Sequence, residues 1–322
     1  MSGPRPHPSL RGGRTDLPYG ARLPGYLVAG GLIGAAEVVP GVSGGTLALV
    51  VGVYDRLITG ADHVVRAATA PVRRGAGAAR EELRRVHWSV LLPVGVGMVA
   101  AVLLGAAAIE PLLEDHPVGM RALFFGFIAA SVAVPLRMSG GLRRARDWAV
   151  LVGAAAAAAV LTGLPPGEVT APALPLVALA AAVAVCALVL PGVSGSFFLL
   201  SVGLYDSTIA AVNDRDLVYL GAFFVGAVLG LASFVRVVRW LLHAHRHVTL
   251  VAMAGLMIGS LRALWPWQDA DRGLLAPTDG VTGVLGVVAV AAVGAIVVAG
   301  LSALDARLSR QAAATGLEPP VH

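Results

Sequence analysis

The chain contains no lysine, a single cysteine and few charged residues. All 24 of its basic residues are arginine, and charged residues make up only 13% of the 322 positions, whereas soluble proteins average about 25%. The lone Cys186 excludes an intramolecular disulfide framework. Hydrophobic residues reach 57%, and the mean hydropathy is +0.79. This composition excludes a soluble globular domain and predicts an all-α polytopic membrane protein.

Several apolar runs are long enough to cross a bilayer, which takes about 20 residues of α-helix. The predicted spans are 88–109, 121–137, 148–164, 217–240, 248–265 and 281–301. Residues 1–25, rich in Arg, Pro and Gly, are expected to form a disordered tail, and residues 303–322 a second tail.

Two further apolar segments carry the related sequences "VVPGVSGG" (38–45) and "VLPGVSGS" (189–196). Proline and glycine interrupt a membrane helix, so each motif predicts a broken helical hairpin. The hairpin at 26–59 has arms that are short for a membrane span, which favours a re-entrant form. The hairpin at 173–211 has longer arms, so a fully spanning form remains open. The predicted helix-breaking residues are Pro40, Gly41, Pro191 and Gly192.

The two motifs belong to a longer internal repeat. Pro40 and Tyr54 match Pro191 and Tyr205 at an offset of 151 residues. Three predicted spans separate the copies, and because three is odd, the second copy enters the membrane from the opposite face. Inverted-topology repeats with broken helices are typical of secondary transporters. The alternative is that glycine and proline merely permit close helix packing.

The repeat divides the chain into two halves of similar build. Repeat 1 is predicted at 26–164, with its hairpin, a basic cytoplasmic loop at 60–87 and three spans. Repeat 2 is predicted at 165–302, with its hairpin and three spans. With a cytoplasmic N-terminus, 20 of the 24 arginines lie on the inner side. The positive-inside rule therefore predicts two cytoplasmic termini, in the cell (inner) membrane.

The first turn after each break is a predicted anion site. A helix N-terminus carries a partial positive charge and free backbone N–H groups, and glycine lets an anion approach them. Hydroxyl groups nearby add donors. The predicted phosphate-binding residues are Ser43, Gly44, Gly45 and Thr46 in the first half and Ser194, Gly195 and Ser196 in the second.

Three charged residues complete the predicted site. Glu37 lies within an apolar segment and has no counterpart in the second half, where Leu188 stands. An ionisable residue inside the membrane is a functional candidate, so Glu37 is a candidate for proton coupling, with helix capping or pairing to an arginine as the alternative. Arg262 and Arg121, near the outer ends of spans, are candidates for attracting a phosphate headgroup, with snorkelling to the interface as the alternative.

An enzyme is the rival class. Residues 41–45 satisfy the G-x-S-x-G pattern of serine hydrolases, but that elbow requires a strand–turn–helix unit, and no histidine lies in a predicted span. His243, His245 and His247 alternate near the cytoplasmic interface, which suits a hydrated basic edge better than a metal site. We expect no metal, cofactor or nucleic-acid partner; the oligomeric state stays open.

The segments "AAEVVPGVSGGTLALVVGVYDRLI" (35–58), "LVLPGVSGSFFLLSVGLYDSTI" (188–209) and "GLMIGSLRALWPW" (255–267) resemble the bacterial polyprenyl-phosphate transporter family. The resemblance covers about residues 23–302. The family usually has Ala-Asp before its first Pro-Gly, where this chain has Ala36-Glu37, and the first-half counterpart of the Gly-Ser-Leu-Arg stretch lacks the arginine.

The resemblance implies a flippase that returns undecaprenyl phosphate, or a related polyprenyl phosphate, from the outer to the inner leaflet for cell-wall synthesis. Its implied partners are that lipid and the membrane lipids, and its implied phosphate-binding residues are the seven above with Arg262. The residues alone leave a transporter of a small soluble anion as the main alternative and an intramembrane serine hydrolase as a remote one.

Overall fold

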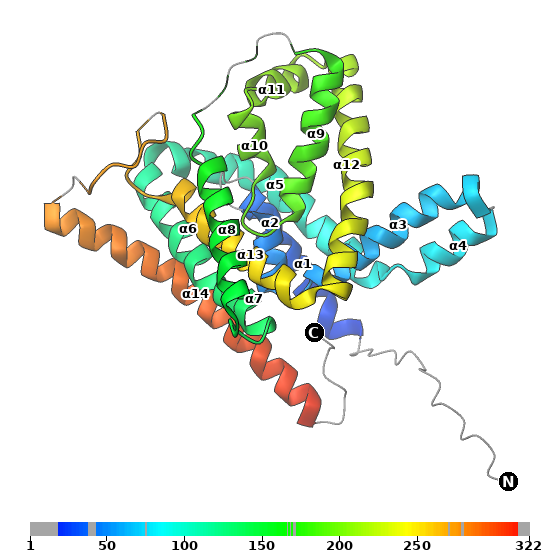
Figure 1. Cartoon of the computed structure of the whole chain (residues 1–322), viewed down its shortest axis with the longest axis horizontal. Helices are drawn as coiled ribbons and strands as arrows, with labels where there is room; N and C mark the ends of the chain where they lie inside the picture. The colour runs from blue at the N-terminus through cyan, green and yellow to red at the C-terminus, as the bar shows by residue number, and fades with distance from the viewer. Residues whose placement is uncertain are drawn as a thin grey trace.

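The computed structural model describes residues 19–314 except 38–42, 75, 166, 168, 170–171, 270 and 278–279. Over these residues the chain is helical, and a single isolated bridge between Gln268 and Leu274 is the only β-type pairing. This confirms the predicted all-α fold (Figure 1). The helices are α1 (Tyr19–Glu37), α2 (Gly44–Val50), α3 (Tyr54–Arg74), α4 (Ala76–Arg85), α5 (Trp88–Asp115), α6 (Pro117–Ser131), α7 (Ala133–Met138), α8 (Ala145–Leu161), α9 (Leu174–Val189), α10 (Gly195–Ser201), α11 (Tyr205–Asn213), α12 (Leu217–Ala244), α13 (Arg246–Ser260), η1 (Leu261–Leu264) and α14 (Gly280–Ala314).

Several of these helices have the length and apolar character of membrane spans. Four helical segments qualify within the described residues, and up to six do if each of two bent helix pairs counts as one span. The four segments are Pro117–Met138, Leu217–Ala244, Arg246–Leu264 and Thr282–Gly300, which match four of the predicted spans. The predicted span 88–109 lies in α5, and 148–164 overlaps α8, which has 17 residues.

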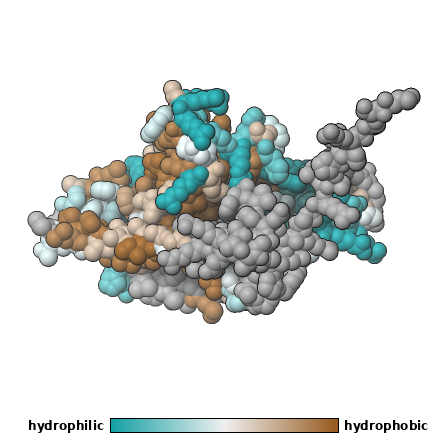
Figure 2. Space-filling model, turned by 90° about the horizontal axis from the view of Figure 1, so that it is seen from below, coloured by the Kyte–Doolittle hydropathy of each residue, from teal (hydrophilic) through white to brown (hydrophobic). Residues whose placement is uncertain are grey.

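Apolar side chains also face outward. Leu217 is 78% exposed, and Phe224 and Ile296 are each 67% exposed. Figure 2 shows apolar atoms, in brown, at the surface of one face of the molecule. Large exposed apolar surfaces are rare in soluble monomers, so these helices face lipid. The chain is an integral membrane protein.

Three segments differ from the sequence-based expectation. α1 begins at Tyr19, inside the predicted tail 1–25, and α14 continues to Ala314, into the predicted tail 303–322. The predicted basic loop 60–87 is mostly helical, because α3 and α4 form an antiparallel pair that projects from the bundle at the right of Figure 1. Both helices are amphipathic. A hydropathy search for spans passes over such helices, because their mean hydropathy is low.

Glycine sets how closely the long helices pack. α1 lies along α5, and α9 lies along α12. A Cβ atom on Gly30 would lie 2.1 Å from the carbonyl oxygen of Val94, and one on Gly226 would lie 2.0 Å from that of Ala178. Only glycine permits this approach, as in other membrane helix pairs. The remaining long helices pair across the halves, α6 with α14 and α8 with α13.

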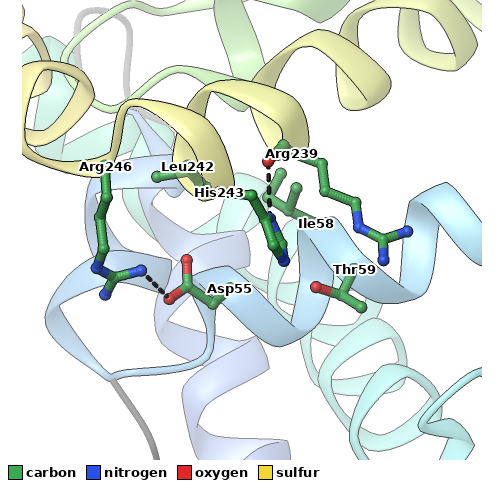
Figure 3. Close-up of a pocket in the computed structure, with 7 residues that line it drawn as sticks. All are labelled: Asp55, Ile58, Thr59, Arg239, Leu242, His243 and Arg246. Atoms are coloured by element: carbon green, nitrogen blue, oxygen red, sulfur yellow. Dashed lines mark hydrogen bonds and ion pairs between the residues drawn. The ribbon is translucent and has the colours of Figure 1, made fainter.

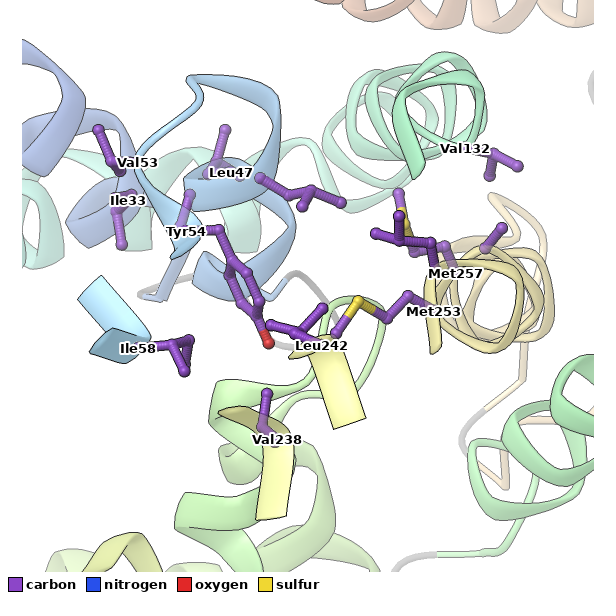
Figure 4. Packing of buried hydrophobic residues seen from close by; sticks show 14 of the residues in the cluster. Ile33, Leu47, Val53, Tyr54, Ile58, Val132, Val238, Leu242, Met253 and Met257 are labelled. Carbon is purple, nitrogen blue, oxygen red and sulfur yellow. The ribbon is translucent and has the colours of Figure 1, made fainter. Parts of the chain in front are cut away.

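The main core lies where the first hairpin meets α12 and α13 (Figure 4). Leu47 and Tyr54 of the hairpin are each at most 4% exposed, and Val238 and Met257 are fully buried. Apolar packing on all sides fixes the position of the short helix α2. The hairpin is therefore held inside the protein, where its interrupted backbone is shielded from lipid.

The connecting segments gather at two ends of the bundle. At one end, Nδ1 of His247 pairs with the carbonyl oxygen of Ser139 at 2.8 Å, and Arg246 pairs with Asp55 at 3.2 Å, so α13, the α7–α8 turn and α3 meet there. At the other end, the amide of Val169 donates to the carbonyl of Gly203 at 3.1 Å, and the side chain of Arg272 donates to the carbonyl of Leu164. The first end, with Arg246, has many arginines in its turns and is called the arginine-rich end. The second end, with Arg272, has few and is called the arginine-poor end.

Candidate functional site

The two Pro-Gly motifs fold alike after the break. Each is followed by a seven-residue helix, α2 or α10, which is about 10 Å long. The N-cap residues Ser43 and Ser194 have nearly identical extended backbones, with φ/ψ of −107°/124° and −104°/128°. Two residues after each short helix ends, a glycine takes the left-handed region, Gly52 at φ +72° and Gly203 at φ +77°. The sequence repeat is thus also a local structural repeat.

The first hairpin binds the broken backbone of the second. The hydroxyl of Ser43 donates to the carbonyl of Leu190 at 3.0 Å, and the amide of Gly192 donates to Oγ1 of Thr46 at 3.0 Å. The hydroxyl of Tyr54 donates to the carbonyl of Val189 at 3.0 Å. A helix break leaves such backbone groups without partners, and burial makes them costly. Three first-half side chains therefore satisfy the second break.

The polar groups of the second motif are used differently. The hydroxyls of Ser194 and Ser196 hydrogen-bond to each other at 3.0 Å, and Ser194 also accepts from the amide of Phe197 at 3.4 Å. Ser194 is buried and Ser196 is half-buried. The second-half hydroxyls therefore remain within their own hairpin, so the paired motifs are alike in backbone but not in bonding.

Close contacts explain the glycines of both motifs. A Cβ atom on Gly45 would lie 2.9 Å from the carbonyl oxygen of Val189, and one on Gly195 would lie 2.5 Å from that of Ala184. Gly192 has φ +86°, and a Cβ there would lie 2.6 Å from the amide nitrogen of Met257. At Gly192, the backbone of the second break thus packs directly against the backbone of α13. Pro191 is buried beside it, while Pro40 and Gly41 lie outside the described residues.

Glu37 caps the first short helix. Its Oε1 accepts a hydrogen bond of 2.7 Å from the amide of Gly44, the first residue of α2. This is the capping arrangement that the sequence left open as an alternative. A carboxylate thus occupies the position at which the glycine-rich turn was expected to bind phosphate. Position 188, the second-half counterpart, is leucine, so α10 has no carboxylate cap from that position.

The two predicted arginines lie apart from the serine motifs. Arg262 is in η1, where its guanidinium lies over Gly163, a residue with no side chain to block it. Arg121 lies near the start of α6, half-buried, and makes no hydrogen bond or ion pair with any described residue. Neither residue bonds to Ser43 or Ser194.

Arg272 is a buried arginine that the sequence analysis did not single out. It is only 8% exposed, its Nη1 donates to the carbonyl of Leu164 and the hydroxyl of Ser201 at 2.9 Å each, and its guanidinium carbon lies 4.0 Å from the ring centre of Phe197. Burial and the neighbouring Arg262 lower the pKa of Arg272. The only sequence signal was an arginine within an otherwise arginine-poor outer loop.

A cavity of about 330 Å³ opens at the arginine-rich end between α3 and α12 (Figure 3). Arg246 pairs with Asp55 across its mouth, and Nδ1 of His243 pairs with the carbonyl oxygen of Arg239 at 2.8 Å. Arg239, which lines the cavity, also pairs with the buried Asp62, as does Arg66. Asp55, in the first turn of α3, thus forms an ion pair.

Metal ligands do not gather in the described part of the chain, where no group of three His, Cys, Asp or Glu side chains is suitably placed. The three alternating histidines take separate partners. His243 bonds the α12 backbone, His245 packs edge-on against Trp240, and His247 pairs with Asp147 at 3.1 Å.

Comparison with known proteins gives the family. Residues 33–280, more than half of the chain, match the family described as undecaprenyl phosphate translocase-like. A protein of Vibrio cholerae named polyprenyl-phosphate transporter is 37% identical over 237 residues, which cover 74% of this chain and 76% of that one. A protein of Staphylococcus aureus with the same name is 26% identical over 256 residues, covering 74% and 85% of the two chains. No solved structure matches the chain. The chain belongs to the undecaprenyl phosphate translocase-like family.

Proposed function

We propose that this protein transports polyprenyl phosphate across the membrane, returning undecaprenyl phosphate or a related lipid from the outer to the inner leaflet for reuse in cell-wall synthesis. The names of the relatives from Vibrio cholerae and Staphylococcus aureus support the substrate class. The observation that carries the proposal is the buried junction of two matching broken helices, formed by Ser43, Thr46 and Gly192. Discontinuous helices that meet inside a bundle form the substrate sites of many transporters.

The architecture of this transporter is proposed to be two inverted repeats with re-entrant hairpins. The pairing of helices supports this, because exchanging the halves maps α1 with α5 onto α9 with α12, and α6 with α14 onto α13 with α8. The short second arms of about 10 Å support re-entrant hairpins, since a spanning arm needs about 30 Å. The gathering of the arginine-rich turns at one end supports cytoplasmic termini in the inner membrane.

The phosphate is proposed to bind between the two short helices. On one side, the donors to the phosphate would come from the predicted residues Ser43, Gly44, Gly45 and Thr46. On the other side, they would come from residues 194–196. Glu37 already holds the amide of Gly44 at 2.7 Å, and two anions cannot share that donor at low cost. A phosphate therefore reaches this amide once Glu37 takes up a proton or turns away.

This competition links transport to protons. Protonation removes the negative charge from Glu37 and weakens its bond to the helix N-terminus, where charge-assisted hydrogen bonds are strong. The phosphate then takes the vacated position. Glu37 takes up this proton from the outer side as the phosphate enters. After the phosphate leaves at the inner side, Glu37 returns to Gly44 and releases the proton to that side. One proton thus accompanies each transported phosphate, and a carboxylate in only one half is sufficient.

The test is transport by the purified full chain in phosphatidylcholine vesicles. We expect accelerated movement of polyprenyl phosphate between leaflets, with no uptake of inorganic phosphate. Equal stimulation of inorganic phosphate uptake would instead identify a transporter of small anions. The double variant Ser43→Ala and Ser194→Ala should lose lipid movement while eluting as a folded protein. Wild-type rates in that variant would remove the serines from the site.

A further inference from the structure

Arg272 carries a buried donor with no partner. Its side chain is more than nine-tenths buried, and Nη2 forms no hydrogen bond to any described residue although it is shielded from solvent. The same guanidinium uses Nη1 for Leu164 and Ser201. An unsatisfied donor on a buried charged group is costly. A structure retains such a group when something else supplies the acceptor.

A second arginine, Arg262, reaches the backbone of Arg272. Nη2 of Arg262 donates to the backbone carbonyl of Arg272 at 3.4 Å, and the two positive charges repel each other. No described carboxylate lies within 4.0 Å of either guanidinium, because none of the ion pairs in that part of the chain includes them. Asp269, close in sequence, accepts from the amide of Gly273 instead. Burying positive charge without a counter-charge is unfavourable, so we expect this pair of arginines to bind an anion.

The location suits an entry point. The guanidinium of Arg272 packs on Phe197, which directly follows Ser196 in α10. Arg272 therefore contacts the helix that begins at the second serine motif, at the arginine-poor end of the bundle. Gly163 leaves room for the Arg262 side chain, since a Cβ there would lie 2.1 Å from Nη1. Arg262 is half-buried and can be reached first.

We propose that Arg262 and Arg272 form an anion-binding entry site for a phosphate monoester at the arginine-poor end of the protein. Arg262 makes the first contact, and Nη2 of Arg272 supplies the second donor after a small local shift. Paired guanidinium groups suit phosphate because their N–H groups match its oxygens in a fork. With the proposed function, on which this inference rests, the phosphate is the headgroup of a polyprenyl lipid arriving from the outer leaflet. Free inorganic phosphate has the same chemistry and is separated by experiment.

The experiment measures binding of polyprenyl phosphate and, separately, inorganic phosphate to the full chain in phosphatidylcholine nanodiscs. Arg272→Gln and Arg262→Gln should each weaken lipid binding about tenfold or more, as expected for loss of a charge-assisted hydrogen bond. The matched control is Arg215→Gln, which removes an exposed arginine from the same end and should leave binding unchanged. Arg272→Lys should restore part of the loss, because it keeps the charge but not the fork.

Each outcome decides the inference. Unchanged binding in Arg272→Gln and Arg262→Gln, or a loss no greater than in Arg215→Gln, overturns it. If Arg272→Gln does not fold, the half-buried Arg262 carries the test. Glu168 lies outside the described residues, so the variant Glu168→Gln is measured as well. If Glu168→Gln loses as much lipid binding and as much melting temperature as Arg272→Gln, then Arg272 is a structural ion-pair partner. That result would overturn the site.

The ligand's source and the proposed function are decided separately. Weakened binding of inorganic phosphate alone in the arginine variants supports an anion site but assigns it to the free ion. Wild-type protein that neither binds nor moves polyprenyl phosphate defeats the proposed function. Wild-type protein that moves the lipid, with Arg272→Gln moving it equally well at limiting lipid concentration, defeats only the entry site.

Discussion

Thr46→Val tests whether the junction of the two hairpins holds the protein together. Thr46 is fully buried, and its Oγ1 is the acceptor for the amide of Gly192 at 3.0 Å. Valine has nearly the same shape, so packing is kept while the acceptor is lost. The amide of Gly192 is then buried without a partner, which costs about 1–3 kcal/mol in the free energy of unfolding.

Thr46→Ser is the matched control. Serine keeps the hydroxyl acceptor and loses one buried methyl group, which costs about 0.8 kcal/mol. The assay is reversible unfolding in mixed micelles with increasing sodium dodecyl sulfate, followed by tryptophan fluorescence. The junction is expected to make the valine variant the less stable of the two. A valine variant within about 0.5 kcal/mol of wild type, or one more stable than the serine variant, would refute the reasoning.

Three further predictions concern single groups. Gly192→Ala should destabilise the protein by more than about 2 kcal/mol, measured in the same assay, because position 192 has φ +86° and the added Cβ would lie 2.6 Å from the Met257 amide nitrogen; an alanine variant of normal stability would contradict that contact. Glu37→Gln should abolish the pH dependence of lipid transport in vesicles, and an unchanged pH profile would remove Glu37 from proton coupling. Asp147 precedes the predicted span 148–164, and hydrogen bonds from the amides of Arg143 and Arg144, with His247 nearby, lower its pKa from 3.8 to about 2. Because the pKa is lower in the folded state, the stabilisation is present above pH 4 and is lost as the pH falls towards 2; Asp147→Asn should flatten that part of the unfolding profile, and a variant with the wild-type acid dependence would contradict this assignment.

Much of the fold follows from local sequence. Long apolar runs predicted the helices α6, α12, α13 and α14, because lipid requires each spanning segment to satisfy its own backbone. The break at Pro191-Gly192 follows from proline geometry. The amphipathic pair α3–α4 was missed, because charged residues on one face lower its mean hydropathy. Helix ends at Tyr19 and Ala314 were also missed, since composition alone suggested tails.

The chemistry available at the centre could be predicted from the chain alone, namely two glycine-rich breaks, their hydroxyl groups and a single carboxylate at Glu37. These are properties of residues close together in the chain. The partners of these groups depend on how the chain folds. Thr46 meets Gly192 across 146 residues, and Arg272 meets Phe197 across 75. Hydrogen bonds between buried groups depend on distance in space, which a local sequence pattern does not record. For this reason the unpaired Nη2 donor of Arg272 can be recognised only in the folded chain.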